Sequence, residues 1–188
     1  MTLGQKLKEI RKRFGLSQES LAEIMNVSRQ AITKWESDEE IPDVSNLQEL
    51  SKVFNLTVDY LLNNDNSLPA LSMKRELDKD KYEMNQKGYI KIIKDNYAEP
   101  WEVYSLRRSK KHSKLAWIIS DFIVGAGPME ALDQIDDMSP YFLAKKDGLK
   151  LLINIHNYIL EVIELPENTN DKKFMYGKNR FSVLNKIS

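Results

Sequence analysis

The chain opens with apolar residues at helical spacing. Leu3, Leu7, Ile10 and Phe14 lie four, three and four positions apart, which places them on one face of a helix. Shorter stripes of the same kind recur up to residue 62, separated by polar connections: Leu21, Ala22, Met25; Ile32, Trp35; Leu47, Leu50, Phe54; Val58 to Leu62. The pattern predicts five short amphipathic helices within residues 2–62, and therefore a compact all-α domain.

Two of these stripes are preceded by the same candidate N-cap residue, a serine. Ser17 and Ser28, eleven residues apart, each follow an apolar residue and precede a helical stripe. A serine in this place accepts hydrogen bonds from the free N–H groups of the first helical turn. Helices that start eleven residues apart have room for about two turns and a tight bend, the spacing of a helix-turn-helix whose second helix enters the DNA major groove. Thr57 begins a further helix in the same way.

The pattern changes after this region. Residues 63–69 are polar and turn-rich, so the first domain is predicted to span residues 1–64. Residues 65–99 are predicted to be a linker with a charged connector helix, which covers residues 72–87 and ends at Gly88. Its only clear apolar anchors are Leu77 and Met84.

Strand-forming residues dominate the remainder of the chain. Twelve of the seventeen aromatic residues follow position 88. Strands are predicted at residues 101–106 and 158–165, with hairpins around Asp147-Gly148 and Gly177, because Asp-Gly suits a two-residue hairpin turn. Residues 113–124 have the spacing of a helix. Residues 100–188 are therefore expected to form a separate small α+β domain with an antiparallel sheet.

Charge balance and composition limit which partners the chain is expected to bind. The whole chain has 28 basic and 28 acidic residues and no cysteine. Residues 1–64 contain eight basic and ten acidic residues, which argues against strong sequence-independent DNA binding, since that affinity comes from neutralising phosphates. Neither a signal-peptide core nor an apolar run long enough for a membrane span is visible. These features predict a soluble, cytoplasmic protein without disulfides or membrane contact.

Residues 16–61 resemble the lambda repressor-like (Cro/CI, or XRE) helix-turn-helix family. The likeness covers about a third of the chain and follows the order and spacing of the family. It is carried by Ser17-Gln18, Leu21-Ala22, residues 27–36, Ile41-Pro42, Leu47 and residues 56–61. The resemblance implies a five-helix DNA-binding domain whose recognition helix starts after Ser28.

The resemblance also implies roles for single residues. Gln18 stands where relatives bind a DNA phosphate. Arg29 and Gln30 stand where relatives commonly read base edges, and Arg pairs well with guanine and Gln with adenine. Thr33 is expected to touch a thymine methyl group or a phosphate. Lys34 is expected to touch guanine or the backbone. The full DNA-binding set is Gln18, Ser28, Arg29, Gln30, Thr33 and Lys34.

Four further features of this region carry expectations. Arg11 and Glu36 are expected to form a structural salt bridge, and Trp35 to pack in the core. Asn26 stands where many relatives have glycine, and suits a left-handed turn residue. Acidic residues follow the recognition helix where some relatives place basic or small ones: Asp38, Glu39, Glu40 and Asp43. This departure weighs against tight DNA binding by a monomer.

The C-terminal half offers little chemistry. His112 and His156 are its only histidines, and no cluster has metal-ligand spacing, so no enzyme, metal or cofactor is expected. The glycine pair at 125–127 is better explained as a loop than as a phosphate cradle. The basic run at 107–114 is a solvated loop, a second phosphate-contacting patch or a site for an acidic partner. Seven aromatic residues are expected to pack in a core, with an effector pocket and a dimer interface as the alternatives: Trp101, Tyr104, Trp117, Phe122, Tyr141, Phe142 and Tyr158.

The predicted function is sequence-specific binding of double-stranded DNA to regulate transcription, most simply as a repressor that binds as a homodimer. Residues 100–188 are expected to dimerise the protein or to bind a small-molecule or protein effector. The alternative is a protein-interaction regulator, antitoxin-like or phage-type, whose C-terminal domain binds a protein partner.

Overall fold

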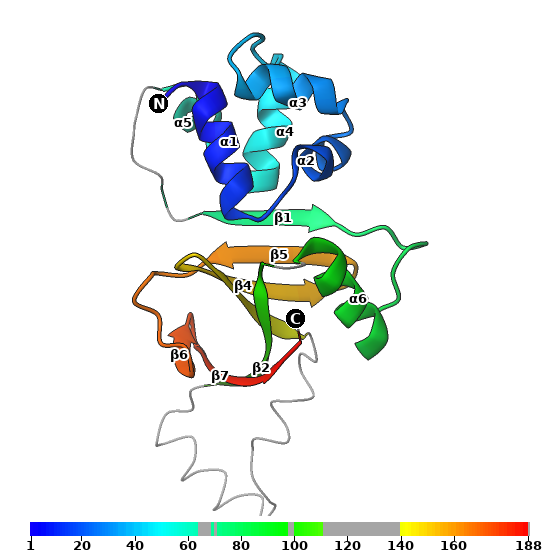
Figure 1. Ribbon diagram of the computed structural model, residues 1–188, viewed down its shortest axis with the longest axis vertical. Helices are drawn as coiled ribbons and strands as arrows, with labels where there is room; N and C mark the ends of the chain where they lie inside the picture. Colours follow the sequence, from blue (N-terminus) through cyan, green and yellow to red (C-terminus); the bar gives the residue numbers. More distant parts are fainter. Residues whose placement is uncertain (64–68, 70, 98–99, 111–139, 188) are drawn as a thin grey trace, which may run out of the picture.

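The computed structural model describes residues 1–63, 69, 71–97, 100–110 and 140–187. Helices form the N-terminal part, and a curled antiparallel sheet with one helix beside it forms the rest (Figure 1). Several predicted features lie outside the described residues: the helix at 113–124, the glycine pair at 125–127, His112, Trp117 and Phe122.

The N-terminal helices start where the sequence predicts. Their bounds are α1 Leu3–Arg13, α2 Gln18–Met25, α3 Arg29–Glu36, α4 Val44–Phe54 and α5 Val58–Leu62. Ser17, Ser28 and Thr57 are confirmed as N-caps, since each side chain accepts a hydrogen bond from a first-turn N–H. Asn26 ends α2 with φ of 52°, the left-handed conformation that the sequence requires of it. The tight turn between α2 and α3 follows from these local choices.

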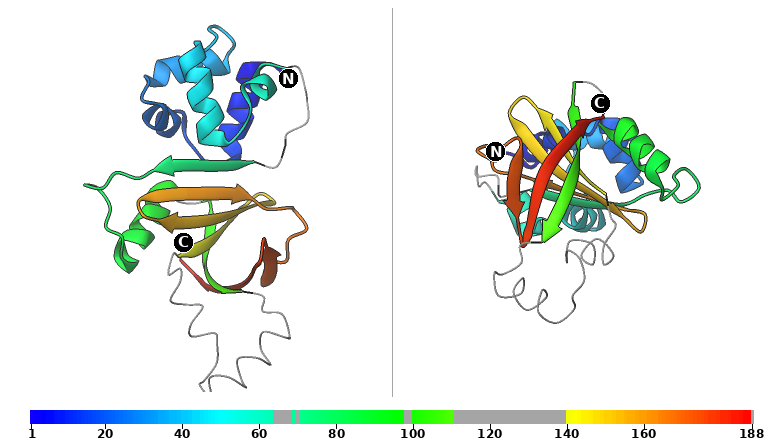
Figure 2. Two further views of the ribbon diagram at one scale, coloured as in Figure 1. Left: turned by 180° about the vertical axis from the view of Figure 1, so that it is seen from behind. Right: turned by 90° about the horizontal axis from the view of Figure 1, so that it is seen from below.

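The sheet contains strands in the order β1-β5-β4-β3-β2-β7-β6, all antiparallel to their neighbours. Their bounds are β1 Ser72–Glu76, β2 Glu102–Lys110, β3 Tyr141–Lys146, β4 Leu149–His156, β5 Ile159–Glu164, β6 Lys173–Tyr176 and β7 Asn179–Lys186. Figure 2 shows how the sheet curls, so that β2, β6 and β7 turn away from the helices. The hairpin at Asp147-Gly148 is confirmed, with φ of 48° and 84°.

The predicted connector helix over residues 72–87 is wrong. Residues 72–76 form the edge strand β1, which pairs with β5, and the helix comes later as α6 Gln86–Asn96. Gly88 does not end a helix but lies in the first turn of α6, where its N–H donates to the Asn85 cap at 2.9 Å. A Cβ on Gly88 would meet the Glu83 carbonyl oxygen at 1.8 Å, so this turn requires glycine.

The hydrophobic core does not divide at residue 64. Buried residues of the helices and of the sheet belong to a single cluster, in which Phe54 of α4 and Met73 of β1 are both members. Strand β1 lies directly against the helices (Figures 1 and 2), and Asn55 donates to the Ser72 hydroxyl at 3.0 Å. A second, smaller cluster is formed by residues of the sheet and of the segment after β5: Leu143, Leu152, Leu165, Phe174 and Phe181.

Candidate DNA-binding surface

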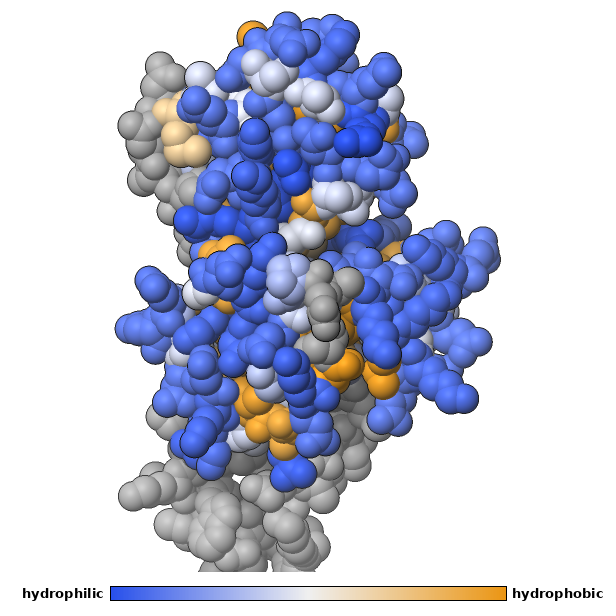
Figure 3. All heavy atoms as spheres, viewed as in Figure 1, coloured by the Kyte–Doolittle hydropathy of each residue, from blue (hydrophilic) through white to orange (hydrophobic). Residues whose placement is uncertain are grey.

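Helix α3 has one buried and one exposed face. Ile32, Trp35 and Glu36 are buried, and Ile32 is completely inaccessible to solvent. The other face exposes Ser28, Arg29, Gln30, Thr33 and Lys34. Hydrophilic side chains cover most of this end of the molecule in Figure 3. The helix therefore offers a polar ridge to solvent, while its apolar side anchors it to α1 and α2.

The backbone at the start of α3 is held by Ser28. Its hydroxyl oxygen accepts from the Ala31 N–H at 3.1 Å, which fixes the first turn. Arg29 and Gln30 come next and point their side chains from this fixed turn, where the first residues of a helix can reach into a groove. Thr33 lies one turn further on, and its hydroxyl also donates to the Arg29 carbonyl oxygen at 3.0 Å.

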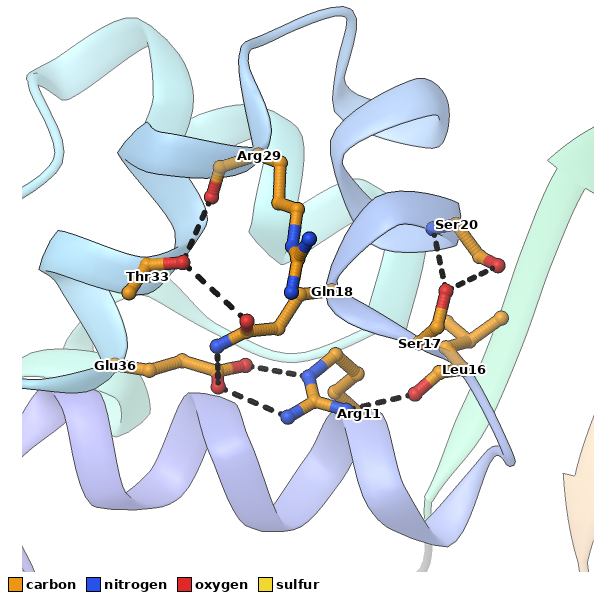
Figure 4. A network of polar contacts seen from close by, with 8 residues as sticks. All are labelled: Arg11, Leu16, Ser17, Gln18, Ser20, Arg29, Thr33 and Glu36. Atoms are coloured by element: carbon orange, nitrogen blue, oxygen red, sulfur yellow. Dashed lines mark hydrogen bonds and ion pairs between the residues drawn. The ribbon is translucent and has the colours of Figure 1, made fainter.

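A buried ion pair sets the angle between α1 and α3. Arg11 donates to both carboxylate oxygens of Glu36, from Nε at 2.5 Å and from Nη2 at 2.9 Å (Figure 4). The Arg11 side chain is 10% exposed and that of Glu36 is 3% exposed. Arg11 Nη1 also donates to the Leu16 carbonyl oxygen at 2.8 Å, so the guanidinium fixes the chain between α1 and α2 as well.

Burial would by itself raise the pKa of Glu36, but the hydrogen bonds from Arg11 and Gln18 outweigh it and lower the pKa below its ordinary value. The carboxylate is therefore ionised at neutral pH.

The structure places Gln18 between α2 and α3, not on a free surface. Its Nε2 donates to Glu36 Oε2 at 2.9 Å, and its Oε1 accepts from the Thr33 hydroxyl at 3.3 Å (Figure 4). Both ends of the amide are thus used within the protein. Gln18 connects the buried ion pair to the exposed ridge of α3 through Thr33.

Lys34 also has a partner within the protein. Its Nζ lies 2.5 Å from Glu40 Oε1, in a pair whose side chains are 47% and 55% exposed. The hydrogen bond that Lys34 donates to the Glu40 carboxylate is the main reason why the pKa of Lys34 is raised.

All four acidic residues after α3 are exposed, and two of them accept hydrogen bonds at helix starts. Asp38 accepts from the Thr2 hydroxyl at 2.6 Å and from the Gly4 N–H at 2.9 Å, which places it at the start of α1. Asp43 is the N-cap of α4, and the hydrogen bond from the Asn46 N–H is the main reason why its pKa is lowered. These two carboxylates stabilise helix starts. Glu39 and Glu40 remain on the exposed side of the loop.

A helix-turn-helix family model matches residues 7–61 of the chain. This range begins in α1, ends in α5 and includes every side chain of the ridge. Residues 7–61 belong to the lambda repressor-like helix-turn-helix family. The family is one of DNA-binding transcription regulators.

Two curated relatives match this lambda repressor-like part of the chain. The HTH-type transcriptional regulator ImmR of Bacillus subtilis is 37% identical over 78 residues, 42% of this chain and 58% of the relative. The HTH-type transcriptional activator BcrR of Enterococcus faecalis is 43% identical over 65 residues, 35% of this chain and 32% of the relative. The chain thus spans between about a third and three fifths of these relatives.

Among solved structures, a crystal structure of the P22 c2 repressor protein in complex with a synthetic operator is 35% identical. The match covers 35% of this chain and 98% of that chain, with a TM-score of 0.34.

Five of the seven aromatic residues singled out in the sequence lie within the described residues, and these five pack in or against the hydrophobic clusters. Trp101 and Phe142 are buried in the main cluster, and Tyr158 packs against it. Tyr104 and Tyr141 pack against the smaller cluster. Of the basic run at 107–114, Arg107 is exposed, and Arg108 lies 5.3 Å from the centre of the Tyr141 ring. Ser109 is exposed, and the side chains of the run from Lys110 onward lie outside the described residues.

The described residues contain neither a metal-binding group nor a membrane-spanning helix. No group of three or more His, Cys, Asp or Glu side chains is placed to hold a metal ion there. Within the same ranges, no helix combines the length and the apolar character needed to cross a bilayer. His156 Nδ1 lies 2.7 Å from the Asn154 side-chain oxygen, at the end of β4.

Sequence reasoning missed one buried cation of the lambda repressor-like region. Lys6 is completely buried, and its Nζ donates to the carbonyl oxygens of Tyr60, at 2.6 Å, and of Asn63. It also lies 4.6 Å from the centre of the Tyr60 ring. The ammonium thereby holds the end of α5 against α1. The sequence carried a weak signal, since Lys6 falls beside Leu7 on the apolar face of α1.

Proposed function

We propose that the chain binds double-stranded DNA in a sequence-specific manner through α3 and regulates transcription. Arg29, Gln30, Thr33 and Lys34 read or contact the duplex, and Ser28 presents the first turn. Gln18 contributes a phosphate contact after its amide exchanges one internal hydrogen bond. The names of the curated relatives include both a regulator and an activator. Repression, by blocking polymerase, is the simplest direction.

The observation that carries this proposal is the division of α3 into two faces. Ile32, Trp35 and Glu36 anchor the helix. The polar residues on its other face stay exposed to solvent: Ser28, Arg29, Gln30, Thr33 and Lys34. Had the sheet covered Arg29 or Gln30, the helix could not reach a groove without a rearrangement of the core. The exposed ridge needs no such rearrangement.

We further propose that the protein acts as a homodimer, because one such helix covers few base pairs and two half-sites supply the missing affinity. Residues 1–64 are the DNA-binding unit with five helices. Residues 100–188 supply dimerisation or an effector site. Sedimentation of the full chain tests the dimer. A monomer at tens of micromolar, both with and without DNA, would contradict it.

The decisive experiment is selection of binding sites from random duplex DNA with the full chain. The affinity for the selected sequence is then measured for Arg29→Ala and Gln30→Ala. Each variant should lose preference at one or two defined base pairs, at a cost of about 1–3 kcal/mol per lost bidentate contact. Because the affected base pairs should differ between the two variants, the pattern also gives the orientation of α3 on the site.

Matched controls are available on exposed positions away from α3. Arg180→Ala on β7 and Gln48→Ala on α4 remove an exposed arginine and an exposed glutamine side chain, the same residue types as Arg29 and Gln30. Both controls should keep the preference of the unmodified protein. The proposal fails if selection enriches no sequence, or if both α3 variants keep the full preference.

A further inference from the structure

The loop after α3 folds back onto the helix. The backbone N–H groups of Glu39 and Glu40 donate to the carbonyl oxygen of Lys34, at 2.9 and 3.4 Å. This turn brings the Glu40 carboxylate over the end of α3, where Oε1 lies 2.5 Å from Lys34 Nζ. Both side chains are about half exposed, and Lys34 lies on the same exposed face of α3 as Gln30 and Thr33.

We propose that Glu40 limits the affinity of α3 for DNA, because it holds the Lys34 ammonium and competes with DNA phosphates for it. The inference rests on the proposed function and deepens it. Glu40 lowers the affinity for the DNA backbone of every sequence, while the base contacts of Arg29 and Gln30, one turn earlier, set which sequence is preferred. The total affinity of the protein is then modest.

The physical reason lies in how sequence-independent affinity arises. Each phosphate that a lysine or arginine neutralises releases counterions, and this release favours binding to every sequence equally. A phosphate that approaches Lys34 must displace the Glu40 carboxylate and then remain close to it. Like charge at that distance costs affinity. The lysine therefore contributes less to backbone binding than its exposure alone would suggest.

The other carboxylates of the loop do not share this role. Asp38 accepts hydrogen bonds at the start of α1, and Asp43 caps α4. Glu39 accepts from the Ser37 hydroxyl at 2.9 Å. Glu40 is thus distinguished from Glu39, its immediate neighbour, by its ion pair with Lys34. This difference supplies the control.

The test compares Glu40→Gln with Glu39→Gln in the full chain. Both changes raise the net charge by one, but only the first releases Lys34. Fluorescence anisotropy would measure binding to the selected duplex and to a scrambled duplex between about 50 and 200 mM salt. Glu40→Gln should bind the scrambled duplex about three- to tenfold more tightly at the lowest salt. The slope of log K against log salt should steepen by about 0.9, the value of one added phosphate contact.

The affinity gain and the salt slope are the decisive readouts. In Glu40→Gln, affinity for the selected duplex should rise by about the same factor as affinity for the scrambled duplex, so their ratio stays constant, because the added phosphate contact favours every sequence equally. Glu39→Gln should leave both affinities and the slope nearly unchanged. In a Lys34→Gln background, adding Glu40→Gln should lose most of its effect. Equal effects of Glu39→Gln and Glu40→Gln would reduce the result to net charge and overturn the inference.

Two further outcomes separate this inference from the proposed function. If the unmodified protein binds its selected site and Glu40→Gln changes nothing, only the inference fails. If neither protein binds any duplex, both fail. Thermal unfolding should show equal midpoints for the unmodified protein and both loop variants, because the substituted side chains are exposed. A lowered midpoint in Glu40→Gln alone would mean that the carboxylate is structural, which also overturns the inference.

Discussion

Arg13 on α1 donates through Nη1 to Oε1 of Glu164 on β5, at 2.8 Å, and so joins the N-terminal helices to the sheet. The two side chains are 28% and 16% exposed. The other Glu164 oxygen, Oε2, is buried and accepts no hydrogen bond. The carboxylate therefore depends on Arg13 for compensation of its charge. Arg13 has a second partner in Glu9, whose Oε1 lies 3.2 Å from its Nε.

This asymmetry predicts unequal costs for the two ends of the pair. Arg13→Gln leaves a largely buried carboxylate without its cation and should lower the free energy of unfolding by about 2 kcal/mol. Glu164→Gln removes that charge and should cost less. Glu9→Gln is the control and should cost below about 0.5 kcal/mol. Urea unfolding measures all three. Equal costs for Arg13→Gln and Glu164→Gln would show that the Glu164 carboxylate is not destabilised by the loss of its cation.

The Arg11–Glu36 pair predicts how stability depends on pH. Because the fold lowers the pKa of Glu36 below its ordinary value of 4.5, its contribution to stability is complete above that value. It is lost as the pH falls through the lower pKa of the folded state. Glu36→Gln should cost about 3 kcal/mol at pH 7, since Arg11 stays buried without its anion. The difference from the unmodified protein should shrink as the pH is lowered below 4.5.

The exposed pair of Glu49 and Lys52 provides the comparison. Its side chains are 46% and 74% exposed. Glu49→Gln should change the free energy of unfolding by less than about 0.5 kcal/mol at any pH. A Glu36→Gln cost that stays constant from pH 7 to pH 3 would contradict the assignment of the pH effect to this carboxylate.

Lys6→Met tests the buried ammonium. Methionine keeps the length of the apolar stem but donates to neither the Tyr60 nor the Asn63 carbonyl oxygen. The expected loss is about 1–3 kcal/mol, the cost of leaving buried acceptors without a charged donor. Lys8→Met, at an exposed position of the same helix, should have almost no effect. Thermal unfolding of both variants measures the effect. A Lys6→Met protein as stable as Lys8→Met would contradict a stabilising role of the Lys6 ammonium.

Gly15→Ala tests the contact between the end of α1 and the start of β2. Gly15 has φ of +70°, and a Cβ there would lie 2.8 Å from the Trp101 indole nitrogen. The variant should lose about 1–2 kcal/mol from backbone strain and more from the displaced indole. Gly177→Ala, at φ of +58° with nothing within 4 Å, isolates the strain. Equal unfolding midpoints for the two variants would mean that Trp101 moves freely.

The helices of the first 62 residues were predictable because their signals are local. A cap such as Ser17 or Ser28 acts on N–H groups two or three residues away, and Asn26 needs only its own left-handed conformation. The same holds for the Asp147-Gly148 turn, where two neighbouring residues set the hairpin. Physics that acts within four residues can be read from a sequence.

Strand β1 could not be read in this way. Leu71, Met73 and Leu77 are buried at alternating positions, but Arg75 interrupts the inward row with a charge. The segment becomes a strand because β5 pairs with it and the helices pack on it. Both partners are remote in sequence, so charge density suggested a helix instead. Helix α6 was missed although Tyr89, Ile92 and Ile93 have helical spacing, because Gly88 was taken as a terminator.

In the candidate site, too, local features were predictable and long-range contacts were not. Helical periodicity predicts which side chains of α3 are exposed. Their partners do not: Gln18 meets Glu36 across 18 positions, and Asp38 meets Gly4 across 34. Which carboxylate of the loop holds Lys34 depended on how the loop turns back. The sequence indicated an acidic loop. It did not show that Asp38 and Asp43 accept hydrogen bonds at helix starts while Glu40 pairs with Lys34.

The continuous core that runs from α4 through Met73 into the sheet fixes the N-terminal helices relative to the sheet. A DNA-binding domain on a flexible linker can reach sites at many separations. Here, movement of the helices relative to the sheet would expose apolar surface. Two copies joined through their sheets would hold a fixed distance between their α3 helices. Inserting about five base pairs, half a helical turn, between the two recognised sequences would then turn one of them to the far side of the DNA. Paired binding would be abolished, not merely weakened.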